Sequence, residues 1–311
     1  MNESPSENMI ETRGLTKRYG SRTAVDGVNL SVPRACAYGF LGHNGAGKTT
    51  LIRMLLGLTH ADAGTMAISG RPVPAERAQV LARVGAIVEE PSFHRYLTGW
   101  ENLRVAASVR GDDALGRIPA VLERVGLADR GGDRVGTYSQ GMRQRLGVAR
   151  CLLADPELLI LDEPMNGLDP AGILELRQMI RSLVAEGRTV FLSSHLLDEV
   201  EKTCDAAAVI DHGKIVEAGP IGTLLRHGVA QLEIGCDQPE RALELLTDHP
   251  AVDAVSLAED GVRISLVSDA QAAAVNAILV EAGVGVFRLA PVRQSLEQRF
   301  LEITSTLGGQ P

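Results

Sequence analysis

The stretch Gly42-His43-Asn44-Gly45-Ala46-Gly47-Lys48-Thr49 decides how this 311-residue chain must fold. It has the pattern G-x-x-x-x-G-K-[ST], in which glycines let the backbone curl until successive N–H groups point at phosphate oxygens. In such a loop the lysine reaches the β- and γ-phosphates and the threonine hydroxyl holds Mg²⁺. The pattern predicts a nucleoside triphosphate site formed by Gly42, His43, Asn44, Gly45, Ala46, Gly47, Lys48, Thr49 and the adjoining Thr50.

The residues on either side of this loop have the pattern that the motif needs. Residues 35–41 are mostly apolar and predict a buried strand that enters the loop. An apolar stripe at i, i+3, i+4 and i+7 predicts a helix that leaves it, formed by Leu51, Met54, Leu55 and Leu58. That helix would aim its positive N-terminal end at the phosphates. A glycine-rich turn with a chance lysine is the alternative, and the order of strand, loop and helix argues against it.

Length and composition limit the class of protein. A length of 311 residues and an apolar content of 45% suit one large domain plus a small one, or two medium domains. The net charge is −8 and no run of five Lys or Arg occurs, so we expect no nucleic-acid partner. No apolar stretch approaches the roughly 18 residues of a membrane span. The polar N-terminus is unlike a signal peptide. We expect a cytoplasmic protein without a covalent cofactor.

The four cysteines are far apart in the sequence and include no C-x-x-C pair. They are Cys36, Cys151, Cys204 and Cys236. Such spacing does not favour a disulfide framework or a zinc site. We interpret them as buried thiols in a reducing compartment.

A second candidate element of the site follows the apolar run at residues 158–161, which predicts a parallel strand covered on both faces. The run ends in Asp162-Glu163-Pro164. A carboxylate at the carboxyl end of such a strand lies beside the phosphate loop. We expect Asp162 to hold Mg²⁺ and Glu163 to orient or deprotonate the water that attacks the γ-phosphate. An acidic strand end before a turn proline is the structural alternative.

A histidine follows the next predicted strand, at residues 189–192. Ser193, Ser194 and His195 come directly after it. Position alone leaves two interpretations of His195 open, a satisfied structural residue or a sensor of the γ-phosphate.

One further motif lies between these elements. Residues Tyr138-Ser139-Gln140-Gly141-Met142-Arg143-Gln144-Arg145 precede an apolar helix at 146–153. This stretch resembles the signature sequence of the ATP-binding-cassette (ABC) superfamily, usually written L-S-G-G-Q followed by x-Q-R. The other motifs then fall in that family's order, between residues 9 and 219.

The resemblance assigns roles to several residues. Tyr19 resembles the aromatic residue that stacks on adenine, and His195 matches the family's switch histidine. Glu163 matches its catalytic glutamate. Residues 166–169, Asn-Gly-Leu-Asp, look like the D-loop that crosses the dimer interface.

The resemblance also implies a fold. We expect an α/β P-loop NTPase of the ABC ATPase type, with a RecA-like core, an antiparallel β subdomain and a helical subdomain. This domain would span residues 9–224, with the helical subdomain at about residues 90–152, after a disordered N-terminus at residues 1–8.

In the family, two subunits pack head to tail, so that the signature of one caps ATP held by the other. Ser139, Gln140 and Gly141 are therefore expected to contact nucleotide bound to a partner ATPase subunit, in a homodimer or a heterodimer. The start of the following helix supplies the anion site. The family further implies separate transmembrane permease subunits, which would hold the chain at the inner face of the cell membrane.

Two residues depart from the wider family. Gln140 stands where a glycine is usual, and Glu89 stands at the position of the Q-loop glutamine. In both features the chain resembles drug-export and lantibiotic-immunity ATPases of the bacitracin-resistance type. The resemblance makes Glu89 a candidate catalytic residue and a candidate metal ligand. A solvated loop charge is the alternative, and the neighbouring Glu90 is a second candidate for the metal.

Three aromatic residues, Phe93, Tyr96 and Trp100, lie close together in the sequence. In the family this region docks the membrane subunit, and an aromatic cluster suits a binding hot spot. Packing within the helical subdomain explains the cluster as well.

The remainder of the chain predicts a second unit. Asp211-His212-Gly213-Lys214 is a hairpin turn signal, and the ATPase core ends soon after it. Residues 228–305 have the β-α-β-β-α-β order of a ferredoxin-like α+β domain. The expected strands are 230–234, 252–257, 262–267 and 286–289, and the expected helices are 239–246, 270–282 and 295–303.

We interpret the chain as the ATPase subunit of a bacterial ABC exporter that uses ATP and Mg²⁺ to move a drug, an antibiotic peptide or a lipid. The alternative is a soluble ABC-type ATPase of DNA repair or translation. Repair types carry a long coiled coil between the phosphate loop and the signature, which are only about ninety residues apart here, without sustained heptads. Translation types usually carry two motif sets and a basic linker. A regulator that does not hydrolyse ATP is a third possibility, against which Glu163 and His195 argue.

Overall fold

The computed structural model describes residues 7–225, 231–267, 271–292 and 296–297. The chain divides into two compact units, Met1–Ile221 and Gly222–Pro311. Residues 1–6 of the expected N-terminal disorder lie outside the described residues, and the first strand begins at Asn8. The domain bounds given above, at 9–224 and 228–305, stay predictions.

The central sheet of the first unit has six strands, β3 (Ala37–Leu41), β6 (Val84–Ile87), β7 (Leu158–Leu161), β8 (Thr189–Ser194), β9 (Ala206–Asp211) and β10 (Lys214–Pro220). Their order is β10-β9-β3-β8-β7-β6, and only the β9–β10 pair is antiparallel among these described strands. Every residue of β3, β7 and β8 is buried, because the sheet is covered on both faces. The carboxyl ends of β3, β7 and β8 therefore meet at one edge.

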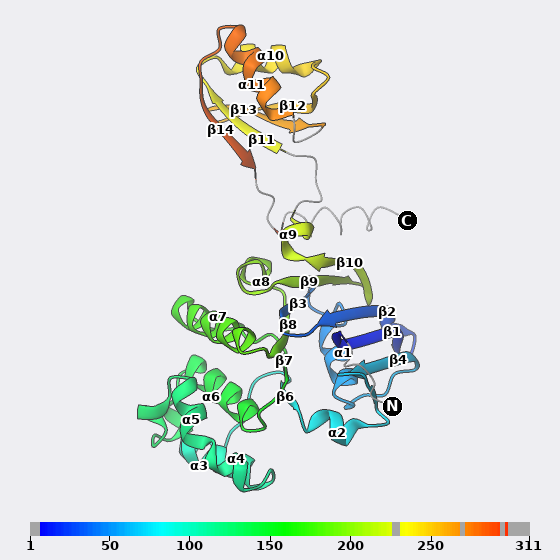
Figure 1. The fold of residues 1–311 in the computed structure, drawn as a ribbon, viewed down its shortest axis with the longest axis vertical. Helices are drawn as coiled ribbons and strands as arrows, with labels where there is room; N and C mark the ends of the chain where they lie inside the picture. Colours follow the sequence, from blue (N-terminus) through cyan, green and yellow to red (C-terminus); the bar gives the residue numbers. More distant parts are fainter. Residues whose placement is uncertain (1–6, 226–230, 268–270, 293–295, 298–311) are drawn as a thin grey trace. The chain divides into compact units, whose positions relative to one another are not determined.

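A second, antiparallel sheet in this unit contains β1 (Asn8–Tyr19), β2 (Arg22–Pro33), β4 (Ala63–Ile68) and β5 (Arg71–Val73), in the order β2-β1-β4-β5. Its buried side chains share one hydrophobic core with helix α1 (Lys48–Leu55) and with strand β3. Figure 1 shows α1 between the two sheets. The phosphate loop is thus held between a central sheet and an antiparallel one.

Helices form the rest of the first unit. They are α2 (Arg77–Leu81), α3 (Gly99–Ser108), α4 (Asp112–Gly116), α5 (Ile118–Arg124), α6 (Gln140–Leu152), α7 (Pro170–Ala185) and α8 (Leu197–Thr203), with 3₁₀ turns at Ala128–Arg130 and Val135–Thr137. Helices α3 to α6 gather into a separate lobe (Figure 1). Thr98 and Glu101 start α3 with a reciprocal capping box. The α/β core, antiparallel sheet and helical lobe confirm the predicted three-part architecture.

The chain around the phosphate loop differs from expectation at two points. The strand entering the loop begins at Ala37 rather than residue 35, because Ala35 has a left-handed backbone with φ 52°. The prediction that Leu58 lies on the buried stripe of the helix is wrong, since its side chain is 57% exposed. Helix α1 ends at Leu55, and Gly57, with φ 63°, turns the chain away before Leu58 is reached.

The short helix α9 (Ile221–Leu224) contains the boundary between the two units. The second unit continues with β11 (Gln231–Cys236), α10 (Pro239–Thr247), β12 (Val252–Ala258), β13 (Gly261–Leu266), α11 (Ala272–Glu281) and β14 (Val286–Val292). The sheet order is β12-β13-β11-β14, with every pair antiparallel. This is the topology of a split β-α-β unit. Its core joins β11, β13 and both longer helices. The closing helix expected at 295–303 lies almost entirely outside the described residues.

All four cysteines are free and buried, as predicted. Burial raises the pKa of Cys36 and of Cys151 to about 11, so these side chains stay thiols near neutral pH. None of the helices in the described ranges combines the length and the apolarity needed to cross a membrane.

Candidate nucleotide-binding site

Three glycines fix the shape of the phosphate loop. A Cβ on Gly42 would lie 2.4 Å from the Ile210 carbonyl oxygen, and one on Gly47 would lie 2.3 Å from the Ala24 carbonyl oxygen. Gly45 and Gly47 also have left-handed backbones, with φ of 85° and 115°. Gly47 is the N-cap of α1 and leaves the first N–H groups of that helix without a side-chain cap. The loop therefore presents a helix N-terminus of the kind that binds phosphate.

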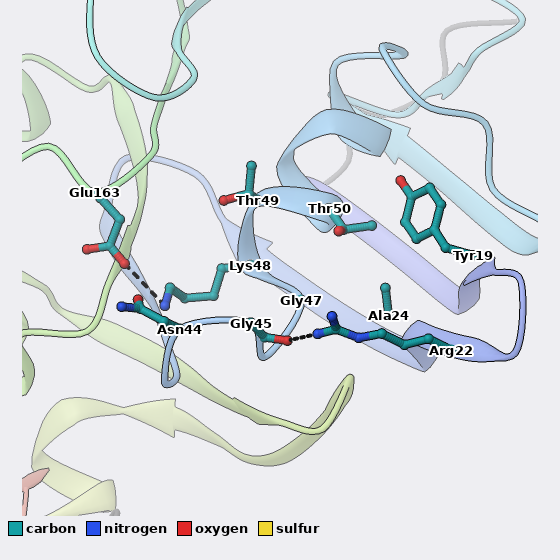
Figure 2. Close-up of a pocket in the computed structure, with 10 residues that line it drawn as sticks. All are labelled: Tyr19, Arg22, Ala24, Asn44, Gly45, Gly47, Lys48, Thr49, Thr50 and Glu163. Carbon is teal, nitrogen blue, oxygen red and sulfur yellow. Dashed lines mark hydrogen bonds and ion pairs between the residues drawn. The ribbon is translucent and has the colours of Figure 1, made fainter.

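A cavity of about 460 Å³ opens beside this loop. Figure 2 shows Glu163 at one end of the loop and the β1–β2 hairpin at the other. The lining residues are Tyr19, Arg22, Ala24, Asn44, Gly45, Gly47, Lys48, Thr49, Thr50 and Glu163. Most of the residues predicted to bind nucleotide from the loop thus border one cavity, together with Tyr19, predicted to stack on adenine, and Glu163, one of the predicted catalytic residues. Arg22 was not predicted.

The charged group at the centre of the site is Lys48, which is only 5% exposed. Its ammonium donates to the carbonyl oxygens of Gly42 at 2.6 Å and of His43 at 3.2 Å. Glu163 Oε1 lies 3.1 Å from the same Nζ, and Glu163 Oε2 lies 2.8 Å from Nδ1 of His195. The structure therefore brings Lys48 and His195, from two other segments, into direct contact with Glu163.

Asp162 directly follows β7 and is 4% exposed. Its Oδ1 accepts a hydrogen bond of 2.5 Å from Ser193 Oγ, and Ser193 Oγ in turn accepts from the Glu163 backbone N–H at 2.9 Å. Thr49 and Asp162 both line a second cavity of about 250 Å³. Hydroxyl and carboxylate oxygens are hard ligands of the type that Mg²⁺ prefers. The donor set predicted for Mg²⁺ thus fits the ion.

Glu89 borders the same second cavity, and so does Glu90. The Glu89 side chain is 66% exposed and forms an ion pair of 2.5 Å with Arg53 of α1. Its backbone is left-handed, with φ 64°. Its role as a metal ligand or catalytic residue stays a prediction, and Arg53 is a partner that sequence reasoning missed.

Tyr19 and Arg22 flank the turn between β1 and β2, where they pair across the hairpin. The Tyr19 ring is 49% exposed, and Lys17 Nζ lies 5.3 Å from its centroid. Arg22 donates to the Gly45 carbonyl oxygen at 2.7 Å and so ties the hairpin to the phosphate loop (Figure 2). Only one feature of the sequence signals the role of Arg22, which is that it follows the predicted adenine-stacking Tyr19 by three residues.

The signature residues lie at the start of α6. Ser139 is the N-cap, and its Oγ accepts from the Met142 backbone N–H at 3.2 Å. Gln140 lines the second cavity and donates from Nε2 to the Asn166 carbonyl oxygen at 3.1 Å. Gly141 follows in the first turn of the helix. Within one chain, Gln140 thus links the signature helix to the loop expected to be the D-loop.

His43 belongs to the phosphate loop, but its ring contacts the end of β9. Its Nε2 lies 2.9 Å from Oδ1 of Asp211, and its Nδ1 lies 2.8 Å from the Asn44 carbonyl oxygen. Ala46 is buried in the core beneath the loop. Among the residues predicted from the loop, Gly42, His43 and Ala46 do not line the larger cavity.

The aromatic residues Phe93, Tyr96 and Trp100, before and within the first turn of α3, do not pack as one cluster. The Arg150 guanidinium lies 4.9 Å from the centroid of Phe93. Tyr96 is 70% exposed and Trp100 is 39% exposed. Packing within the lobe therefore accounts for Phe93 and leaves Tyr96 and Trp100 at the surface.

Comparison with known proteins identifies relatives of the whole chain. The family model for the ABC transporter matches residues 25–166. The chain is 42% identical over 296 residues to the bacitracin transport ATP-binding protein BcrA of Bacillus licheniformis, covering 95% of this chain and 97% of that protein. It is 40% identical over 243 residues to the Nod factor export ATP-binding protein I of Ralstonia nicotianae, covering 76% and 73%. A solved ATP-binding subunit of an ABC transporter superposes with a TM-score of 0.63 at 29% identity, covering 70% of this chain and 92% of that one.

Proposed function

Because the chain belongs to the ABC transporter family, we propose that it is the ATP-hydrolysing subunit of an exporter whose membrane-spanning part is a separate permease. The chain binds and hydrolyses ATP, as members of this family do. The observation that carries the residue assignments is the direct contact of Glu163 with Lys48 and His195 beside the phosphate loop.

We assign the hydrolytic step to Glu163. ATP entering the loop offers phosphate oxygens to the Lys48 ammonium, and such charge-assisted hydrogen bonds are stronger than neutral ones. Glu163 then loses its contact with Lys48 and is left to orient or deprotonate the water that attacks the γ-phosphate. His195, 2.8 Å from Glu163 Oε2, keeps the carboxylate in place. The products are ADP and inorganic phosphate.

Thr49 and Asp162 would hold Mg²⁺, with Glu89 as a further candidate. When held there, the ion would neutralise charge on the phosphates of ATP. The Ser193 hydroxyl fixes the Asp162 carboxylate by a hydrogen bond of 2.5 Å, so this metal ligand is already oriented.

The nucleotide site requires a second ATPase subunit. Ser139 and Gln140 are exposed on the signature helix, where Ser139 caps the N-terminus. An exposed helix N-terminus suits the phosphates of a nucleotide held by a partner chain. We therefore propose a head-to-tail dimer, formed with an identical or a related subunit.

The names of the relatives support a proposal for the class of cargo. Their names refer to bacitracin transport and to Nod factor export. We propose that this chain supports export of a drug, an antibiotic peptide or a lipid, and that the permease holds it at the inner face of the cell membrane. Relatives named for transport align over nearly the whole chain. They do not favour a soluble repair or translation ATPase.

The test is ATP binding and ATP hydrolysis by the purified chain, with and without its permease. Glu163→Gln should bind ATP normally and hydrolyse it about 10²–10⁴-fold more slowly, because a positioned base is lost. Lys48→Ala should instead weaken ATP binding.

Glu123→Gln is the matched control, since it removes a carboxylate from the exposed face of α5. It should hydrolyse ATP at the native rate. Near-normal turnover by Glu163→Gln would remove Glu163 from the mechanism, and native ATP affinity in Lys48→Ala would contradict the phosphate-loop assignment.

A further inference from the structure

Three metal-binding side chains meet on the side of the phosphate loop next to the β9–β10 turn. They are His43 from the loop, Asp211 from the last position of β9 and His212 from the turn. One ligand atom from each lies within 4.8 Å of the other two. The two imidazole rings stand edge to face, with centroids 5.6 Å apart. None of these side chains has a part in the hydrolytic step proposed above.

The hydrogen bond at Nδ1 of His43 determines which groups its Nε2 atom can bind. Nδ1 lies 2.8 Å from the Asn44 carbonyl oxygen, which can only accept, so Nδ1 must carry the hydrogen. In the neutral ring Nε2 then carries a lone pair, which faces Oδ1 of Asp211 at 2.9 Å. Two acceptors at that distance repel each other unless a positive charge lies between them. A second ring proton or a bound cation satisfies both atoms.

Asp211 is suited to hold a cation there because it is a buried carboxylate, only 7% exposed. Its Oδ2 lies 3.9 Å from Nε2 of His212, a side chain that is 86% exposed and can turn toward it. The backbone fixes this arrangement. The Gly213 N–H donates to the Ala46 carbonyl oxygen at 3.0 Å, and the Gly213 carbonyl oxygen accepts from the Asp26 N–H at 2.8 Å. The turn is thus bonded to the phosphate loop on which His43 lies.

We propose that His43, Asp211 and His212 form a binding site for a transition-metal ion of the Zn²⁺ class, which ties the phosphate loop to the β9–β10 turn. Two imidazoles and one carboxylate are a known ligand set for Zn²⁺ with a fourth position left to water. Metal-ligating histidines usually donate their other ring N–H to a carbonyl or carboxylate, as Nδ1 of His43 does to Asn44.

This site differs in chemistry from the predicted Mg²⁺ site. Thr49 and Asp162 offer only oxygen ligands, whereas the His43–Asp211–His212 site offers two nitrogens, and imidazole favours Zn²⁺, Cu²⁺ or Ni²⁺ over Mg²⁺. Metal binding at this site requires neither ATP nor a permease. A metal here would act on the loop itself, because the His43 carbonyl oxygen accepts from Lys48 Nζ at 3.2 Å.

The experiment measures Zn²⁺ binding to the full-length, nucleotide-free protein, by competition with a chromophoric chelator in excess Mg²⁺. The test variant is His212→Asn. Residue 212 has a left-handed backbone with φ 45°, which asparagine tolerates well, so the turn should be retained while the imidazole is lost. His60→Asn is the matched control, because His60 is also exposed and lies outside the three-residue site.

We expect one Zn²⁺ per chain for the native protein and for His60→Asn, with affinity reduced at least about tenfold in His212→Asn. Co²⁺ in place of Zn²⁺ should give visible absorption bands of a tetrahedral nitrogen and oxygen site, which His43→Asn removes. Equal Zn²⁺ affinity in the native protein and His212→Asn would overturn the proposal. So would the absence of stoichiometric Zn²⁺ binding, or a Co²⁺ spectrum unchanged by His43→Asn in a protein whose circular dichroism is native.

Discussion

The backbone at Glu163 shows how a single residue is positioned for its proposed role. Glu163 has φ 47°, in the left-handed region that side chains other than glycine rarely adopt. Such a conformation costs on the order of 1–3 kcal/mol and persists only where neighbouring contacts hold it. Here the Glu163 N–H donates a hydrogen bond to Ser193 Oγ, and the Glu163 carboxylate contacts both Lys48 and His195. The sharp turn after β7 therefore aims the side chain at the phosphate loop.

Also at the residue scale, substitutions of Tyr19 test where the adenine binds. Its half-exposed ring borders the larger cavity, so we expect it to stack on the base. Tyr19→Ala should raise the KM for ATP, because stacking on an aromatic ring is worth roughly 1–3 kcal/mol by alanine substitution. Tyr19→Trp should keep the native KM. The measurement is steady-state ATP hydrolysis over a range of ATP concentrations.

Phe287→Ala is the control for loss of an exposed aromatic ring, since Phe287 is 68% exposed in the second unit. It should leave the KM for ATP unchanged. If Tyr19→Ala also has the native KM, Tyr19 does not contact the base.

Glu89 gives a prediction about Mg²⁺. A carboxylate there adds negative charge beside the phosphates of a metal-free site, so native ATP affinity should depend more steeply on Mg²⁺ than that of Glu89→Gln. The Arg53 guanidinium, 2.5 Å away, offsets part of this charge. Arg53→Gln should therefore make the dependence steeper than in the native protein. The measurement is ATP affinity titrated against Mg²⁺ for the three proteins.

Superimposable titration curves for the native protein and Glu89→Gln would mean that Glu89 does not act on the metal. Glu90, which borders the same cavity, would then take its place as the candidate.

At the scale of helices and strands, the sequence predicts the elements well because their signals are local. The apolar run at residues 158–161 became the fully buried strand β7, and the six elements predicted between residues 230 and 289 are present in the predicted order. Leu58 was misplaced because helix periodicity does not reveal where a helix ends, and Gly57 turns the chain after α1.

Side-chain partners between distant elements could not be predicted in the same way. The Arg22–Gly45 hydrogen bond joins residues 23 positions apart, and the Arg53–Glu89 ion pair joins residues 36 positions apart. Each depends on how two elements pack, which no local pattern encodes. The phosphate loop, by contrast, carries its geometry in its own glycines, and most of its residues line the larger cavity.

The contact between α6 and the loop after β7 gives a prediction at this scale. Gln140 Nε2 donates to the Asn166 carbonyl oxygen at 3.1 Å, and a Cβ on Gly167 would lie 2.4 Å from the same Nε2. Gln140→Leu keeps the bulk and removes the donor. We expect kcat for ATP hydrolysis to fall by roughly tenfold or less, since a neutral hydrogen bond contributes about 1 kcal/mol.

Gln79→Leu, on the exposed face of α2, controls for the added apolar side chain and should keep the native kcat. A native kcat in Gln140→Leu as well would show that the hydrogen bond to Asn166 does not position the loop.

At the scale of the whole molecule, the exposed aromatic residues on the helical lobe have no role in the nucleotide site. Tyr96 is 70% exposed and Trp100 is 39% exposed, whereas both cavities beside the phosphate loop are lined by other residues. Tryptophan and tyrosine are enriched at the residues that contribute most to protein–protein binding. We therefore expect Tyr96 and Trp100 to contact the proposed permease.

The double variant Tyr96→Ala/Trp100→Ala should hydrolyse ATP at the native rate when it is isolated, because neither residue borders the nucleotide cavities. Reconstituted with the permease, it should bind more weakly and lose most of the cargo export, since a hot-spot residue contributes about 2 kcal/mol or more to an interface. Leu58→Ala, at a side chain 57% exposed elsewhere in the same unit, is the control and should export normally. Native permease affinity and export in the double variant would place the permease contact on another surface of the chain.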